Sequence, residues 1–303
     1  MKEKQEILNK GKKVFEWRVF AFSNGDIVGR IFFGRHYFPD SQTDVFGDCC
    51  LLYKDKDGSV RWQREYLLHN NFPDEIMKVD LYDPKKAIEL MYEDVNKIFS
   101  CSLEYRRIQN ITFLPKRETE DLLWRSPLPF ADVVGEVRIN DYQTPFRGIG
   151  FIGNNLIAYP TKLFLQNIFD SLFWYWHFFS SKRIGVVLIL GMVQSSSFLV
   201  VKIDNRLFIF NSHQFTVSFS WGNECSYPEK SIIKASNEDV DIEIINEKKY
   251  IEPLPHKYSP YFHFINVEGS VKDKQNSKKI HFSGVGFHEC KGGDKFKLGG
   301  VNR

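Results

Sequence analysis

The chain has 303 residues, 43% of them hydrophobic, 26% charged and 16% aromatic, with a formal net charge of +3. Its length predicts one large β domain or two domains of ordinary size, and the small net charge argues against a nucleic-acid-binding protein. The aromatic excess, which includes 28 phenylalanines, favours β-strands and apolar pockets.

The first part of the chain predicts two β-hairpins. Asn24-Gly25 and Asp57-Gly58 are strong hairpin-turn signals, and each lies between runs rich in β-branched and aromatic residues. The strands of these hairpins are predicted at Glu16–Ser23 with Ile27–Phe33 and at Cys49–Tyr53 with Val60–Leu68. These pairings are antiparallel and local in sequence.

Two further segments have helical features. Asp83-Pro84 suits the start of a helix, because Asp is a good N-cap and Pro is favoured at the first helical position. Apolar residues then follow it at helical spacing, at Ile88, Met91, Val95 and Ile98. Thr161–Phe173 also has apolar residues in helical register. The sequence predicts at most these two short helices.

Strands predominate in the rest of the chain. A proline-rich crossing loop is expected from Pro115 to Pro129, and Val133–Asn140 alternates apolar and polar residues, as a strand with one wet face does. The other predicted strands are Ser102–Leu114, Ile184–Met192, Phe198–Ile203, Leu207–Phe210, Val240–Ile244, Tyr261–Val267 and Lys279–Glu289. Many short strands with few helices predict an all-β sandwich or barrel architecture.

The most distinctive stretch runs from Phe146 to Phe179. It contains a glycine-rich segment, Gly148 to Asn155, which we interpret as a turn, and then an aromatic cluster at Phe173–Phe179. Glycines, two adjacent side-chain amides and an aromatic wall together predict a lined pocket. The glycine segment also spells GxGxxG, but it lacks the βαβ setting of a nucleotide-binding loop.

The cysteines, the histidines and the two ends of the chain bear on compartment and partners. The five cysteines are odd in number and form no CxxC pair, which argues for a cytoplasmic protein without disulfides or zinc; they are Cys49, Cys50, Cys101, Cys225 and Cys290. The histidines show no metal-ligand spacing, so no metal is expected. Met1–Lys13 is charged and predicts no secretory signal. Lysines near the C-terminal end favour a solvated tail, with a peripheral membrane contact as the alternative.

Several short motifs resemble one family of proteins. They are, in order, Gly135-Glu136-Val137, Phe146-Arg147-Gly148-Ile149-Gly150-Phe151, Trp174-Tyr175-Trp176 and Gly284-Val285-Gly286-Phe287-His288-Glu289. This order is similar to the carotenoid 1,2-hydratase (hydroxyneurosporene synthase) and AttH-like group, whose relatives include fungal lipocalin-like Diels–Alderases. The resemblance implies two tandem lipocalin-like β-barrel or sandwich domains, which we place at 14–158 and 159–303 after a charged segment at 1–13. It also implies a pocket, between or within the two domains, for an extended apolar molecule.

One departure from the family's pattern bears on the chemistry. Hydratases of this group carry Gly-Tyr-His-Asp-His-Asn where this chain has Gly150, Phe151, Ile152, Gly153, Asn154 and Asn155. Because the His and Asp side chains are missing, cyclisation or a pericyclic reaction is a better expectation than carotenoid hydration.

Protonation of an alkene needs an acid that burial keeps neutral and a surface that tolerates a cation. Asp170 and Glu289 are the candidate catalytic acids near the motifs, and Glu16 is the third. The candidate substrate-binding residues are Trp17, Phe151, Asn154, Asn155, Trp174, Trp176 and His177. Each also has an ordinary structural explanation, since carboxylates are usually solvated or paired, aromatic residues form β cores and asparagines stabilise turns. His288 would face the opposite side of a strand from Glu289, so at most one of the two enters the pocket.

The sequence therefore favours a cofactor-independent enzyme that acts on an apolar isoprenoid, terpenoid or polyketide-like molecule. The reaction would be hydration, double-bond isomerisation or cyclisation. The alternative is a non-catalytic carrier of lipophilic molecules. A buried acid that faces the aromatic residues would favour the enzyme over the carrier.

Overall fold

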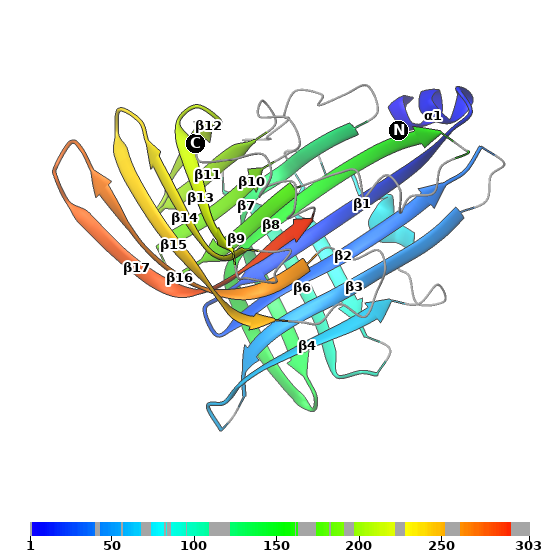
Figure 1. Cartoon of the computed structure of the whole chain (residues 1–303). Helices are drawn as coiled ribbons and strands as arrows, with labels where there is room; N and C mark the ends of the chain where they lie inside the picture. The colour runs from blue at the N-terminus through cyan, green and yellow to red at the C-terminus, as the bar shows by residue number, and fades with distance from the viewer. Residues whose placement is uncertain are drawn as a thin grey trace. The chain divides into compact units, whose positions relative to one another are not determined.

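The computed structural model describes residues 2–39, 43–55, 57–67, 74–81, 83, 86–94, 96–108, 122–160, 162, 174–181, 183–190, 197–221, 228–251 and 261–291. The chain forms two compact units, Met1–Leu163 (unit 1) and Phe164–Arg303 (unit 2). Each unit is built around one antiparallel sheet (Figure 1). The predicted all-β architecture is confirmed, because the helical segments among these residues are only helix α1, Lys2–Asn9, and the 3₁₀ turn Asp74–Met77.

Unit 1 contains an eight-stranded sheet with the order β4-β3-β2-β1-β8-β7-β6-β5. Its strands are β1 Lys12–Ser23, β2 Ile27–Tyr37, β3 Thr43–Lys54, β4 Val60–Leu67, β5 Ile88–Glu93, β6 Phe99–Arg107, β7 Leu122–Ile139 and β8 Tyr142–Pro160. The first strand, β1, pairs on one side with β2 and on the other with the last strand, β8. The middle of the sheet is therefore formed by residues that lie far apart in the sequence.

The two predicted hairpins are confirmed. At the first turn Gly25 has a φ of 96°, and Asn24 Oδ1 accepts hydrogen bonds from the backbone N–H groups of Asp26 and Ile27 at 3.1 and 2.9 Å. At the second turn Gly58 has a φ of 81°. Each turn thus depends on a glycine in the left-handed region, which the local sequence alone specifies.

The helix predicted at Asp83–Ile98 is wrong. Ile88–Glu93 is strand β5, whose residues alternate between buried and exposed. Met91, which belongs to the apolar set at helical spacing, is 71% exposed. The segment forms a strand because pairing with β6 supplies hydrogen bonds to the backbone of β5 and buries one of its faces. The helix predicted at Thr161–Phe173 lies outside the described residues, except for Lys162.

The glycine-rich segment Gly148–Asn155 is not a turn but part of the continuous strand β8. A Cβ atom at Gly150 would come within 2.5 Å of side-chain atoms of Tyr105 and Val133 and within 2.7 Å of the Ala21 carbonyl oxygen. The glycine is therefore required by close packing inside the sheet rather than by backbone reversal.

The proline-rich segment predicted as a loop is also partly a strand, since β7 begins at Leu122. The register of β7 against β8 shifts between Arg125 and Leu128 and again between Leu128 and Ala131. These irregularities accommodate Pro127 and Pro129, which have no N–H group to donate to the ladder. Residues 115–121 lie outside the described part of the chain.

Unit 2 contains a nine-stranded sheet with the order β12-β11-β10-β9-β17-β16-β15-β14-β13. Its strands are β9 Trp174–Ser180, β10 Ile184–Leu190, β11 Phe198–Ile203, β12 Arg206–Asn211, β13 Phe215–Trp221, β14 Pro228–Ser236, β15 Val240–Ile251, β16 Tyr261–Asp273 and β17 Lys279–Lys291. Two of these strands, β13 and β14, were not predicted. As in unit 1, the first strand and the last strand of the unit lie side by side.

Each unit has its own hydrophobic core. The core of unit 1 contains Phe20, Phe33 and Tyr105, and that of unit 2 contains Tyr175, Phe179 and Leu188. Every residue of β9 is buried, so this strand is covered on both faces. Among the residues placed by the structure, no helix is long and apolar enough to cross a membrane.

Candidate functional site

An acid and several aromatic side chains gather on one face of β9 and β17. Trp176 is directly opposite Glu289, and Phe178 is directly opposite Phe287. Directly opposed residues of antiparallel strands share a face, and so do residues two apart on one strand, which adds Trp174. We call Trp174, Trp176, Phe178, Phe287 and Glu289 the acid–aromatic cluster. Tyr175 and Phe179, which belong to the core of unit 2, lie on the opposite face of β9.

The acid of this cluster is buried and held in place. Glu289 is only 9% exposed, and its Oε1 atom accepts a hydrogen bond of 2.9 Å from Trp174 Nε1. The ring of Trp176, 4% exposed, meets the ring of Phe287 edge-on at a centroid distance of 4.9 Å. A carboxyl group lies here beside aromatic rings whose faces can stabilise a positive charge.

The structure thus brings together three residues that the sequence predicted: Trp174, Trp176 and Glu289. His177 follows Trp176 on β9 but points to the other face, into the core of unit 2, with no exposed surface. His288 likewise lies on the opposite face from Glu289, as predicted. Asp170, the second predicted acid, lies outside the described residues.

The remaining candidates belong to unit 1, on β1 and β8. Trp17 is directly opposite Asn155, and the pairing of Ala21 with Phe151 puts Phe151 on the same face. All three candidate side chains are buried, Asn155 at 5% exposure. Asn154 points to the other face, where it is opposite Arg18. The two asparagines therefore serve different surfaces of the sheet and do not act as one amide pair.

The third candidate acid, Glu16, lies on β1 near Arg18. Its Oε1 atom is 3.9 Å from Arg18 Nη2. Arg18 is buried and also donates a hydrogen bond of 2.8 Å to the backbone carbonyl of Val79. Arg18 also donates to the backbone carbonyl of Ile76 at 2.5 Å, so it ties the 3₁₀ turn to β1.

Unit 2 also contains a buried polar network that sequence reasoning missed. Asn246 Nδ2 donates to Ser231 Oγ at 2.9 Å, and Ser231 Oγ lies 3.0 Å from the Tyr175 hydroxyl. The Tyr175 hydroxyl is 3.3 Å from His288 Nδ1, and His288 Nε2 is 2.9 Å from His263 Nδ1. All five residues are at most 2% exposed. We call this chain of contacts the Tyr–His network.

Burial sets the protonation state of the Tyr–His network. It raises the pKa of Tyr175 well above its usual value, lowers the pKa of His263 to about 3 and lowers the pKa of His288 well below its usual range. Desolvation disfavours the charged form of each group. The network is therefore neutral near pH 7. No sequence spacing could reveal it, because its members meet only through the sheet order β9-β17-β16 and the curvature that brings Tyr175 to Ser231.

A buried group of charged side chains in unit 1 lacks the features of this site. A buried ion cluster in unit 1 joins Asp48 to Arg30 and Arg64, with Arg64 Nε donating to Asp48 Oδ2 at 2.9 Å. Within the part of the chain that the structure describes, no group of His, Cys, Asp or Glu side chains is arranged to hold a metal ion.

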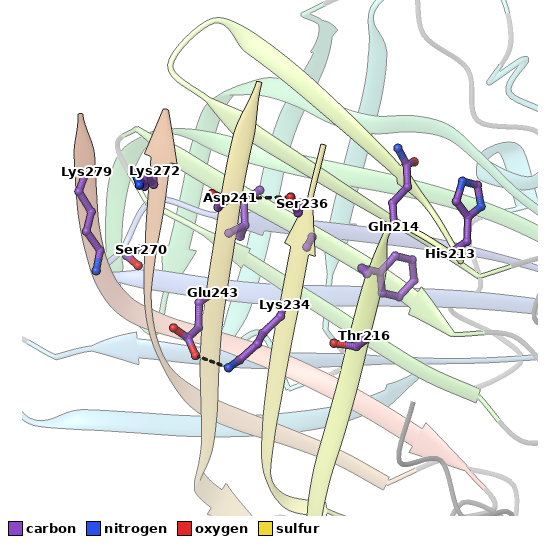
Figure 2. A pocket seen from close by; sticks show the side chains of 13 residues that line it. His213, Gln214, Thr216, Lys234, Ser236, Asp241, Glu243, Ser270, Lys272 and Lys279 are labelled. Carbon is purple, nitrogen blue, oxygen red and sulfur yellow. Dashed lines mark hydrogen bonds and ion pairs between the residues drawn. The ribbon is translucent and has the colours of Figure 1, made fainter. Parts of the chain in front are cut away.

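An open depression of unit 2 is lined by residues of β13 to β17 (Figure 2). Lys234 Nζ pairs there with Glu243 Oε1 at 3.2 Å, and Ser236 Oγ donates to Asp241 Oδ1 at 2.8 Å. None of the predicted site residues lies in this depression.

Comparison with protein-family models and with curated proteins finds no match to this sequence. Solved structures do match. An AttH-type protein from Nitrosomonas europaea is 10% identical, with a TM-score of 0.52 over 94% of this chain and 93% of that chain. CghA, solved with Sch210972, is 8% identical, with a TM-score of 0.51 over 93% and 89%. Kievitone hydratase from Nectria haematococca is 10% identical, with a TM-score of 0.46 over 91% and 88%.

The likenesses to the AttH-type protein and CghA extend over nearly the whole chain but have low sequence identity, so they establish the fold alone. The two units with their single curled antiparallel sheets agree with that architecture. The chain has the fold of the AttH-type protein and CghA, which consists of two lipocalin-like β domains in tandem.

Proposed function

We propose that this protein is an enzyme that acts on an alkene of an apolar isoprenoid or polyketide-like molecule without a cofactor. The observation that carries the proposal is the acid–aromatic cluster, in which the buried Glu289 lies on one face with Trp174 and Trp176. A carrier of apolar molecules needs aromatic walls but has no use for a buried acid among them, since burial of a carboxyl group costs free energy.

The proposed reaction begins with proton transfer from the Glu289 carboxyl group to one carbon of the double bond. The π electrons form the new C–H bond, and the other alkene carbon becomes a cation that faces the rings of Trp174 and Trp176. Attack by water, with loss of its extra proton to the Glu289 carboxylate, then gives hydration. Loss of a neighbouring C–H proton to that carboxylate gives isomerisation, or cyclisation when a second alkene has first attacked the cation. The hydrogen bond from Trp174 Nε1 orients the carboxyl group for this transfer.

The likeness to CghA adds support of a more general kind. That protein was solved with Sch210972, so this fold can hold a ligand. A pericyclic reaction is the second candidate, because the family's His and Asp are replaced by Ile152 and Gly153 in this chain. Such a reaction needs only a pocket that folds the substrate, and no acid.

The test is turnover of a panel of polyprenyl and polyene compounds by the purified protein, without added cofactor, followed by mass spectrometry. A product heavier by one water indicates hydration, and a product of unchanged mass with new retention indicates isomerisation or cyclisation. Compounds that bind but are recovered unchanged would contradict the proposed enzyme function and favour the carrier function. A product formed equally well by Glu289→Gln would contradict protonation by Glu289 and favour the pericyclic reaction.

A further inference from the structure

Three buried histidines form a row across the inner face of the unit 2 sheet. His177 on β9 is directly opposite His288 on β17, and His288 is directly opposite His263 on β16. Directly opposed residues point to the same face, and this is the face that carries the unit 2 core. The three side chains are 0%, 2% and 1% exposed, in that order. The row lies on the opposite face of β9 from the acid–aromatic cluster.

Counting donors and acceptors gives the Tyr–His network one favoured direction. Asn246 already donates to Ser231 Oγ, so the Ser231 hydroxyl can donate to Tyr175, Tyr175 to His288 Nδ1, and His288 Nε2–H to His263 Nδ1. In this arrangement each hydrogen from Ser231 to His288 has an acceptor within the network. The reverse arrangement leaves the Ser231 hydrogen with none of these acceptors. The network is therefore complete in itself as far as His288.

His177 stands outside this network. Neither Nδ1 nor Nε2 of His177 has a hydrogen-bond partner among the residues that the structure describes, although both atoms are fully buried. Burial also lowers the pKa of His177 to about 3, so the ring is neutral and presents one N–H donor and one lone pair. Its neighbours on this face include Leu188, opposite on β10, and Phe179, two residues along β9. Buried polar groups are almost always paired, so a buried ring whose two nitrogens lack a hydrogen-bond partner among the described residues indicates a bound partner.

We propose that His177 binds the hydroxyl group of an uncharged, largely apolar alcohol inside unit 2. A hydroxyl group both donates and accepts, so it pairs with either ring nitrogen of a neutral imidazole in either tautomer, whereas a ketone oxygen pairs only with the N–H. Leu188 and Phe179 suit an apolar body. A charged ligand is disfavoured, because the histidine row is neutral and Lys248, a cation that acts on it, is paired with Glu229 at 3.5 Å.

This site does not depend on the proposed enzyme function, since it lies on a different face and uses none of the acid–aromatic cluster. The two proposals can therefore fail separately. Glu289→Gln tests the first and should leave alcohol binding at His177 unchanged. The same holds for Trp174→Phe.

The experiment is NMR of the full chain with ¹⁵N-labelled histidine, titrated with 1-octanol and, separately, with octanoate. We expect 1-octanol to shift the ring nitrogens of His177 in a saturable way and octanoate to leave them unchanged. In calorimetric titrations His177→Phe should bind 1-octanol about tenfold more weakly, the loss of one neutral hydrogen bond. His281→Phe, at an exposed position of β17, is the matched control and should bind as the wild type does.

Three results would overturn the proposal. The first is a His177 signal that 1-octanol does not move, which would mean that water alone occupies the site. The second is equal affinity of His177→Phe and wild type. If His177→Phe does not fold, His177→Gln takes its place, because glutamine keeps a donor and an acceptor and should still bind 1-octanol. The third result is therefore a folded His177→Gln with no affinity for 1-octanol.

Discussion

At the scale of single residues, Gly150 shows how tightly the unit 1 sheet is packed. Atoms of Tyr105, Val133 and Ala21, on strands β6, β7 and β1, lie within 2.7 Å of where its Cβ atom would be. We expect Gly150→Ala to lower the free energy of unfolding by about 1–3 kcal/mol, the usual cost of overpacking a core. Urea denaturation followed by circular dichroism measures this loss.

Gly58→Ala is the matched comparison for Gly150→Ala. Gly58 has a φ of 81°, and the nearest atom to its Cβ position is 4.0 Å away, so the substitution strains the backbone without a clash. We expect a loss of about 1 kcal/mol from the left-handed conformation alone. A larger loss for Gly58→Ala than for Gly150→Ala would contradict the packing explanation of the glycine-rich segment.

At the scale of elements, the histidine row of β9, β17 and β16 makes the stability of unit 2 depend on pH. The pKa values of His177 and His263 are lowered to about 3, and that of His288 is lowered well below its usual range, whereas histidines of the unfolded chain titrate near 6.5. Between these values the unfolded chain binds more protons than the folded protein. The neutral histidines therefore make their full contribution to the free energy of unfolding above about pH 7. This free energy falls as the pH falls, by up to about 1.4 kcal/mol per pH unit for each histidine.

Urea denaturation at pH 7, 6 and 5 tests this linkage. His177→Phe should make the loss of stability shallower by about 1.4 kcal/mol per pH unit, since one titrating group is removed. His281→Phe, which alters an exposed side chain, should leave the slope unchanged. Equal slopes for wild type and His177→Phe would show that His177 is not held neutral in the folded protein.

The ion cluster across β2, β3 and β4 makes a second prediction at this scale. Asp48 is shared by Arg30 and Arg64, and all three side chains are at most 6% exposed. Asp48→Ala should destabilise the protein by about 3–5 kcal/mol, because two buried guanidinium groups lose their carboxylate. Thermal unfolding measures the effect. Glu93→Ala, which breaks an exposed ion pair with Arg138, should change the midpoint little, and an equal change in both variants would contradict a buried role for Asp48.

At the scale of the whole molecule, the sequence predicted what local chemistry decides. Hairpin turns at Asn24-Gly25 and Asp57-Gly58 and the all-β architecture are visible in residue types and alternation. The helix at Asp83–Ile98 was wrong because apolar spacing over a short segment fits two periods, and only pairing with β6 decides between them. The turn at Gly148–Asn155 was wrong because glycine also serves close strand packing.

In the candidate sites, too, local strand geometry could be predicted and contacts between distant strands could not. Alternation along β17 correctly separated Glu289 from His288, since it depends only on strand geometry. The Tyr–His network could not be predicted, because its residues lie on β9, β14, β15, β16 and β17 and meet only when unit 2 has formed its sheet. Local sequence patterns do not predict which distant strands pair.

The central claim is that Glu289 supplies a proton within the acid–aromatic cluster. The most direct measurement compares turnover of a polyene or polyprenyl substrate by wild type, Glu289→Gln and Glu268→Gln, an exposed acid on the adjacent strand β16. We expect Glu289→Gln to bind the substrate as wild type does but to lose at least about a hundredfold in turnover, the usual contribution of general acid catalysis. Glu268→Gln should retain full turnover. Undiminished turnover by a folded Glu289→Gln would contradict the claim.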